Sequence, residues 1–158
     1  MLFTQIMQQG VRWASQAGVM LGLENVDNPF LESLGKSLRL VQELNSPWFR
    51  LYPDMGNLAA AGYHPPHELS LAAGHVVAIH VKDALPGIIR GVPFEEGIVP
   101  FVETFQALAR IGFWGPMGVE MWGQMDTRRD PLAAAIAARK LVERLTAMAW
   151  PEYSPPGT

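Results

Sequence analysis

Four short apolar runs, separated by longer amphipathic stretches, organise this chain of 158 residues. The runs lie at residues 19–23, 48–52, 75–79 and 116–119. Near-continuous apolar segments of this kind are typical of strands in a parallel sheet that is covered on both faces. They therefore predict an α/β fold with four buried parallel strands.

Helical patterns fill the segments around these runs. We expect helices at residues 1–16, 30–44, 66–73, 100–111 and 131–148. The last of them has Asp130 as its N-cap and Pro131 at its first position, and both residue types are favoured at a helix start. A helix followed by four strand–helix units predicts right-handed crossover connections and one parallel sheet.

The composition excludes several classes of protein. A net charge of -3 without any basic cluster argues against a nucleic-acid-binding surface. No apolar run reaches the roughly 18 residues that span a bilayer, and residues 1–9 lack the features of a signal peptide. We expect a cytoplasmic protein with one domain over residues 1–150 and a proline-rich, disordered tail over residues 151–158.

Each apolar run is followed by a residue that can bind a cation. These residues are Glu24, Asp54, His80 and Glu120. Ligands of parallel α/β folds bind at the carboxyl ends of the strands, where neighbouring strands lie roughly 5 Å apart. Because the chain has no cysteine, a metal must be held by carboxylates and imidazoles. Three carboxylates and one imidazole suit one divalent ion such as Zn²⁺, Mn²⁺ or Co²⁺.

Each of these residues also has a simpler interpretation. A glutamate that follows a strand is often a surface residue. Asp54 could do no more than shape the turn at residues 53–56, and His80 could be a core histidine bonded to a carbonyl group. We prefer the metal site because four separate runs that all end in a ligand-type residue are hard to explain by chance.

Four motifs carry a resemblance to a known family: Leu-Tyr-Pro-Asp-Met-Gly-Asn at 51–57, Ala-Ile-His-Val-Lys-Asp at 78–83, Val-Pro-Phe-Glu-Glu-Gly at 92–97 and Gly-Val-Glu-Met-Trp at 118–122. The chain resembles the L-ribulose-5-phosphate (L-xylulose-5-phosphate) 3-epimerases. These belong to the sugar isomerase/epimerase superfamily, which has a xylose-isomerase-like (β/α)8 TIM barrel. The resemblance runs over about residues 1–150, with the motifs in order.

The resemblance implies a site and a reaction. Glu24, Asp54, His80 and Glu120 would be the four metal ligands, and Glu24 and Glu120 the catalytic acid–base pair. The implied reaction is 3-epimerisation of a ketopentose 5-phosphate, in which a proton leaves C3 to give an enediolate and returns on the other face.

Other residues have weaker assignments. Arg90 could hold a substrate oxygen or phosphate, or it could be a solvated loop arginine. Asn57 could contact a sugar hydroxyl or cap the following segment. Lys82 and Asp83 could support the metal ligands from behind, or they could form a surface ion pair of little energetic value. For Trp122 we favour a packing role over a platform for the sugar.

The family barrel has eight βα units, whereas this chain has four, which correspond to the C-terminal half. A half-barrel leaves two strand edges open. We expect either a homodimer or a separate N-terminal half to complete the barrel. The alternatives are a truncated, metal-binding but catalytically silent remnant, and an aldose–ketose isomerase of the hexulose-6-phosphate type on the same scaffold. An endonuclease-like hydrolase is disfavoured by the acidic pI and the lack of a basic groove.

Overall fold

The computed structural model describes residues 2–123 and 130–152. In chain order the elements are α1 (Leu2–Ala17), β1 (Leu21–Leu23), α2 (Leu34–Leu44), β2 (Phe49–Leu51), α3 (Met55–Ala60), α4 (Pro65–Leu71), β3 (Ile79–Val81), α5 (Phe101–Arg110), β4 (Met117–Val119) and α6 (Pro131–Ala149). The predicted alternation of strands and helices is confirmed, and α3 is an additional short helix.

The four strands are parallel and lie in chain order. β1 pairs with β2, and β3 pairs with β4. Parallel bridges between Leu51 and Val76 and between Asp54 and His80 join the two pairs. Within the described parts of the chain, the outer sides of β1 and β4 have no strand partner. The sheet is therefore an open half of a barrel wall.

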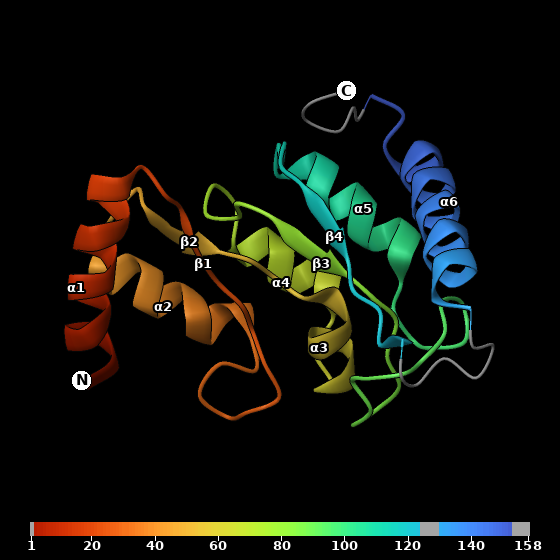
Figure 1. Cartoon of the computed structure of the whole chain (residues 1–158), viewed down its shortest axis with the longest axis horizontal. Helices are drawn as coiled ribbons and strands as arrows, with labels where there is room; N and C mark the ends of the chain where they lie inside the picture. The colour runs from red at the N-terminus through yellow and green to blue at the C-terminus, as the bar shows by residue number, and fades with distance from the viewer. Residues whose placement is uncertain (1, 124–129, 153–158) are drawn as a thin grey trace.

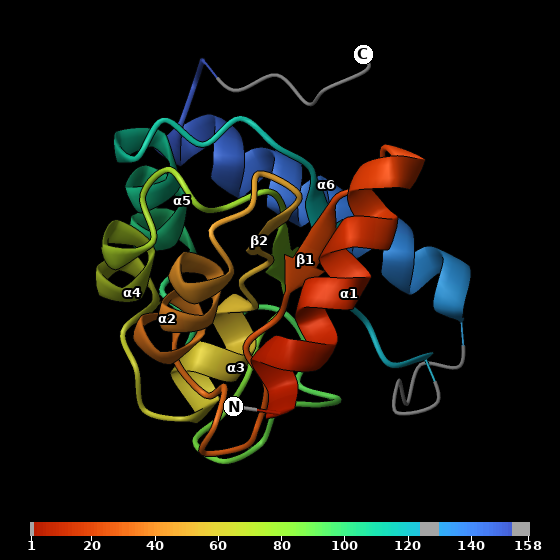
Figure 2. The ribbon, with the colours of Figure 1, turned by 90° about the vertical axis from the view of Figure 1, so that its left-hand side faces the viewer.

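The main helices form a layer outside the strands (Figures 1 and 2). Successive helices of this layer touch one another, in the order α1, α2, α4, α5 and α6. Helix α1 lies at one end of the layer and α6 at the other (Figure 1). The fully buried core side chains between helices and strands are large and apolar, and they include Leu34, Phe49, Leu51, Leu69, Ile79, Phe105 and Leu108.

The prediction for the third strand was wrong in its position. The regular strand is Ile79–Val81 rather than 75–79, and His80 lies inside it instead of ending it. Leu51 bridges to Val76, and Asp54 bridges to His80. The chain therefore advances by four residues from Val76 to His80, but by only three residues from Leu51 to Asp54 on the neighbouring segment. One extra residue is bulged between the two bridges, and an apolar pattern alone does not reveal a bulge.

Helix α2 begins at Leu34, later than the predicted residue 30, because its cap lies at Ser33. The Ser33 side chain accepts a hydrogen bond from the Lys36 N–H. The Glu68 carboxylate of α4 accepts two more, from the N–H groups of Leu34 at 2.7 Å and Gly35 at 3.2 Å. These bonds satisfy donors that a helix start leaves unpaired.

No described helix is long and apolar enough to cross a membrane. Of the predicted tail, residues 153–158 lie outside the described residues, so its expected disorder stays a prediction.

Candidate metal centre

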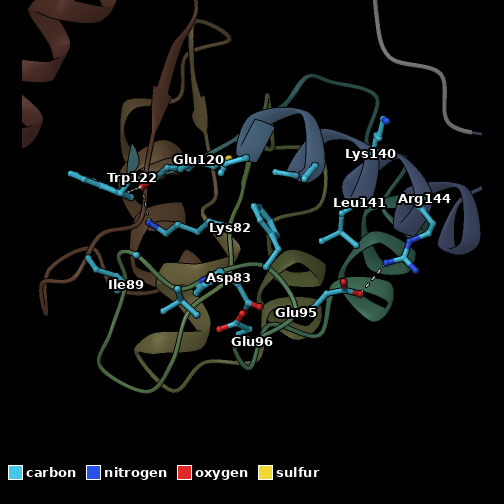
Figure 3. A pocket seen from close by; sticks show the side chains of 18 residues that line it. Lys82, Asp83, Ile89, Glu95, Glu96, Glu120, Trp122, Lys140, Leu141 and Arg144 are labelled. Atoms are coloured by element: carbon cyan, nitrogen blue, oxygen red, sulfur yellow. Dashed lines mark hydrogen bonds and ion pairs between the residues drawn. The ribbon is translucent and has the colours of Figure 1, made fainter. Parts of the chain in front are cut away.

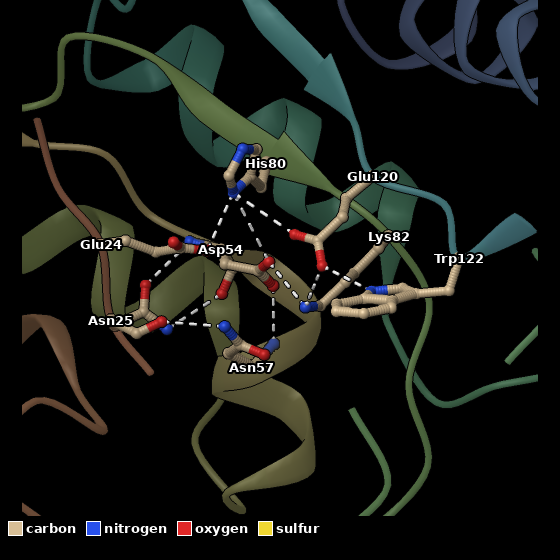
Figure 4. A network of polar contacts seen from close by, with 8 residues as sticks. All are labelled: Glu24, Asn25, Asp54, Asn57, His80, Lys82, Glu120 and Trp122. Atoms are coloured by element: carbon tan, nitrogen blue, oxygen red, sulfur yellow. Dashed lines mark hydrogen bonds and ion pairs between the residues drawn. The ribbon is translucent and has the colours of Figure 1, made fainter. Parts of the chain in front are cut away.

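The four predicted ligand residues come together at the carboxyl ends of the strands (Figure 4). Glu24 follows β1, Asp54 is the N-cap of α3 after β2, His80 is central in β3, and Glu120 follows β4. One ligand atom from each side chain lies within 4.8 Å of those from the other three. The structure thus brings together the four residues that the sequence singled out, although His80 lies inside a strand and not at its end.

His80 is the hub of the cluster. Its Nδ1 atom lies 2.9 Å from Glu24 Oε1, 3.5 Å from Glu120 Oε2 and 3.8 Å from Asp54 Oδ2. The hydrogen bond to Glu24 raises the pKa of His80 above its usual value, and the surrounding carboxylate charges outweigh the opposing effect of burial. Among the described residues the imidazole therefore pairs with acids and with no backbone carbonyl, which argues against the core-histidine interpretation.

Asp54 is fully buried and its two oxygens have different environments. Oδ1 accepts a hydrogen bond of 2.7 Å from Asn57 N and so caps α3. Oδ2 lies 3.0 Å from Lys82 Nζ as an ion pair, but it accepts no hydrogen bond of favourable geometry. Burial raises the pKa of Asp54 to about 7, against the charge of Lys82. Asp54 shapes the turn and also points an unsatisfied oxygen into the cluster.

Glu120 is held by two donors on one oxygen. Its Oε1 atom accepts hydrogen bonds from Trp122 Nε1 at 2.9 Å and from Lys82 Nζ at 3.0 Å. Burial alone would raise the pKa of Glu120, but these two bonds and the Lys82 charge outweigh burial and lower it. The other oxygen, Oε2, is the one nearest His80. Glu120 is thus fixed as an anion with one oxygen facing the cluster.

Asn25 is a supporting residue that the sequence analysis missed. Its buried side chain accepts from Asp54 N at 2.8 Å and donates to Asp54 O at 3.1 Å. Its own carbonyl accepts a 2.9 Å bond from Asn57 Nδ2. Asn25 thereby continues the β1–β2 pairing beyond Leu51 through a side chain. Its position directly after Glu24 was the available signal.

Tyr52 was also missed, and it packs on the hub of the cluster. Its ring centroid lies 4.3 Å from that of His80. A Cβ atom at Gly22 would lie 2.9 Å from Tyr52 Cβ, and one at Gly118 would lie 2.8 Å from the Tyr52 hydroxyl oxygen. Two glycines, one on β1 and one on β4, therefore leave the space that this ring occupies. Burial and the neighbouring carboxylates raise the pKa of Tyr52, so its phenol stays neutral.

Lys82 and Asp83 are both buried, which rules out the surface ion pair as their role. The Asp83 carboxylate accepts hydrogen bonds from the N–H groups of Ala84, Gly97 and Val99. A side chain at Gly97 would collide with Asp83. Asp83 therefore closes the base of the loop at residues 84–99, while Lys82 turns the other way, into the cluster.

Arg90 lies on that loop and is exposed. Its guanidinium carbon is 4.8 Å from the centroid of the Trp122 ring, a cation–π contact. Trp122 therefore joins Arg90 to Glu120 and is not a packing residue of the core. Asn57, by contrast, is buried, and its amide is bonded to Asn25.

A cavity of about 940 Å³ adjoins the cluster (Figure 3). Lys82, Glu120 and Trp122 line the end next to the cluster. Leu141 and Arg144 of α6 line the far end, where Arg144 makes a 3.0 Å ion pair with Glu95. A space of this size accommodates a small ligand.

The donor set fits a divalent cation. It offers three carboxylates and one imidazole nitrogen at mutual distances that a single ion can bridge. The buried Asp54 Oδ2, which lacks a hydrogen bond, is the kind of atom that a bound cation satisfies. Supporting bonds from Asn25, Lys82 and Trp122 orient the ligands, as is common around metal sites.

The chain is similar in sequence and in fold to several known proteins. Over 147 residues the chain is 42% identical to the L-ribulose-5-phosphate 3-epimerases of Shigella boydii and Escherichia coli, covering 93% of this chain and 51% of each relative. The structure of an L-ribulose 3-epimerase superposes with a TM-score of 0.75 at 19% identity, over 92% of this chain and 53% of the other. A D-tagatose 3-epimerase-like protein gives 0.79 at 18% identity, over 92% and 54%.

The chain spans about half the length of the curated relatives that it matches. At their level of identity, the two solved structures establish the fold alone. Residues 3–145 match the family described as the xylose isomerase-like TIM barrel. This match extends over most of the sequence, and the chain belongs to the xylose isomerase-like TIM-barrel family.

Proposed function

We propose that this chain provides the metal centre and the acid–base pair of a sugar-phosphate 3-epimerase that acts on a ketopentose 5-phosphate. The convergence of four ligand atoms within 4.8 Å at four strand ends is the observation that carries the proposal. The identity to relatives named L-ribulose-5-phosphate 3-epimerase supports the substrate class, with L-ribulose 5-phosphate or L-xylulose 5-phosphate as the candidates.

Glu24, Asp54, His80 and Glu120 would hold one divalent ion, Zn²⁺, Mn²⁺ or Co²⁺. When bound, such an ion supplies Lewis-acid stabilisation for negative charge on the oxygens at C2 and C3 of the ketose. The chain has no cysteine, so the donor set contains no thiolate. It therefore has no preference for an ion that binds sulfur.

Glu24 and Glu120 would carry the protons. They follow the first and the last strand of the half-barrel, and both lie against His80. One carboxylate removes the proton from C3, which leaves an enediolate, and the other returns a proton to the opposite face. Inversion at one carbon needs two such groups on two sides of the substrate, and the positions of these glutamates after the first and the last strand support that assignment.

Two further residues would act around the substrate. Arg90 would bind a substrate oxygen or the phosphate, and the contact of its exposed guanidinium with Trp122, which bonds to Glu120, supports this role. Asn57 is engaged by Asn25 and by the Asp54 cap, which supports a role in holding Asp54 over direct contact with the sugar.

A complete barrel requires a partner for the open sides of β1 and β4. A second copy of this chain or a separate N-terminal half would each supply four more strands. Light scattering coupled to size-exclusion chromatography distinguishes a homodimer from a monomer.

A competing function is a metal-binding but catalytically silent chain, because the outer sides of β1 and β4 have no strand partner among the described residues. The deciding experiment incubates the metal-loaded protein with L-ribulose 5-phosphate in deuterated water and follows C3 by NMR. Exchange of the C3 proton with appearance of the epimer supports the epimerase. Metal binding without any exchange supports the silent chain, and a shift of the carbonyl to C1 would identify an aldose–ketose isomerase.

A further inference from the structure

The Lys82 ammonium is buried inside the cluster of acids. The residue is 5% exposed, and Nζ lies 3.0 Å from Asp54 Oδ2 and 3.0 Å from Glu120 Oε1. Figure 4 shows the side chain reaching between these two carboxylates. Across the residues that the structure describes, Lys82 is the only lysine or arginine that forms an ion pair with the centre.

The local structure makes room for this lysine. Gly56, in the first turn of α3, lies against its aliphatic stem, and a Cβ atom at Gly56 would be 2.5 Å from Lys82 Cγ. Lys82 also lies at the end of β3, opposite in orientation to Asp83, which bonds to the neighbouring loop. The backbone is therefore arranged so that a long cationic side chain enters the centre from the side of α3.

The charge of the centre explains why a cation is held there. Glu24, Asp54 and Glu120 place three carboxylates around one imidazole, and carboxylates so close together repel one another strongly when little water screens them. A divalent ion alone leaves one negative charge unbalanced, whereas a divalent ion together with the Lys82 ammonium balances all three. Buried charge is costly unless it is paired in this way.

We propose that Lys82 is a built-in counter-cation of the metal centre, which keeps the carboxylates assembled before the metal arrives and moderates the affinity for the metal afterwards. The proposal rests on the metal centre of the proposed function and not on the sugar substrate. It makes Lys82 a positioning residue that acts through Asp54 and Glu120.

The direction in which the metal affinity changes when Lys82 is removed distinguishes this role from others. A residue that merely positioned ligands would weaken metal binding when removed. Removal of a counter-cation leaves the centre more negative, so metal binding should become tighter while the metal-free protein becomes less stable.

The test is Lys82→Met, which keeps the apolar stem and removes the charge. Titration calorimetry with Mn²⁺ at about pH 8 should give a dissociation constant about tenfold lower than that of the wild type. Thermal unfolding of the metal-free variant should begin at a lower temperature, and added Mn²⁺ should raise the midpoint by more than in the wild type. Lys36→Met, which breaks the partly exposed ion pair with Glu32, is the matched control and should change neither quantity.

A chemical rescue separates charge from packing. Because the chain has no cysteine, alkylating Lys82→Cys with 2-bromoethylamine while unfolded restores an ammonium at position 82 only. After refolding, the wild-type affinity and metal-free midpoint should return. Unchanged or weaker Mn²⁺ binding by folded Lys82→Met would overturn the proposal, as would failure of the alkylated protein to recover. If Lys82→Met does not fold without metal, Mn²⁺ must restore its folding for the proposal to stand. None of these readouts depends on epimerisation, so failure of the proposed reaction would leave them intact.

Discussion

Asn25 binds both backbone groups of Asp54, accepting from its N–H at 2.8 Å and donating to its carbonyl at 3.1 Å. The two residues follow neighbouring strands, and their pairing sets the height of the Asp54 carboxylate relative to Glu24. The position of one metal ligand is thus fixed by the residue that directly follows another.

Replacing Asn25 with Ala should therefore loosen the centre as well as the fold. The buried N–H of Asp54 would lose its partner, and the carbonyl would keep only the bond from Leu58 N, at a cost of about 1–3 kcal/mol in the free energy of unfolding. Urea denaturation measures this loss, and Mn²⁺ titration should show weaker binding. Asn28→Ala, which removes an exposed amide that bonds to Phe30 N, serves as the control and should change stability by less than about 1 kcal/mol. Equal effects of the two changes would show that Asn25 does not organise the site.

His80→Ala should abolish stoichiometric metal uptake and leave the fold largely intact. The imidazole is the only nitrogen among the four ligand groups and lies at hydrogen-bond distance from Glu24. Metal content after dialysis is measured by atomic emission, and circular dichroism monitors the fold. His67→Ala, at an exposed position, should retain the metal. One bound ion per chain in His80→Ala would show that the histidine is not a ligand.

Glu120→Gln should stop proton exchange at C3 even where some metal remains. The amide keeps the shape of the side chain and its bond from Trp122, but it cannot take up a proton as a carboxylate does. Loss of one acid–base group typically lowers the rate by about 10²–10⁴-fold. The measurement is NMR of the substrate in deuterated water. Exchange at the wild-type rate would remove Glu120 from the pair of proton carriers.

The metal-free protein should lose stability as the pH rises through neutrality. Burial raises the pKa of Asp54 to about 7, and the bond to Glu24 raises that of His80. Both groups hold their protons more tightly in the folded than in the unfolded state, so the stability that they provide at lower pH is lost in this range. Bound metal replaces the protons, and its stabilising effect should therefore grow with pH. Thermal unfolding from about pH 5.5 to 8.5, with Mn²⁺ or with chelator, tests both pH trends. Unfolding midpoints that change with pH in the same way under the two conditions would contradict the expectation.

Glu68→Gln should destabilise the fold without changing the metal centre. Its carboxylate accepts hydrogen bonds from the N–H groups of Leu34 and Gly35 at the start of α2, and none of these three residues belongs to the cluster of four. Replacing the charged acceptor with a neutral amide should cost about 1 kcal/mol in the free energy of unfolding. Urea denaturation measures the cost. The Mn²⁺ affinity of the folded variant is the internal control and should equal that of the wild type.

The sequence indicated the four candidate ligands more readily than the residues that support them. Glu24, Asp54, His80 and Glu120 were identifiable because each follows or ends an apolar run, and parallel strands bring such ends together. Asn25 and Tyr52 act through side chains that bridge between strands. No spacing rule reports which neighbours they reach until the register is known.

The predicted helix boundaries were wrong where tertiary contacts determine where a helix begins. The apolar pattern extended α2 back to residue 30, but Glu68 of another helix fixes its start near Leu34. Helix α3 is too short to show a helical period, although the Asp54 cap was a usable signal for it.

The bulge before His80 has a consequence for how the site could be broken without touching any ligand. In an uninterrupted ladder continuing from the bridge between Leu51 and Val76, Asp54 would face Ile79. The additional residue advances the chain by one step and brings an imidazole opposite the carboxylate instead. Because consecutive side chains of a strand point in opposite directions, inserting a single residue between Val76 and Ile79, with the bulge kept at one residue, should place the apolar side chain of Ile79 where the imidazole now faces Asp54. The chemistry of this centre thus depends on a shift of one residue in the register between two neighbouring strands.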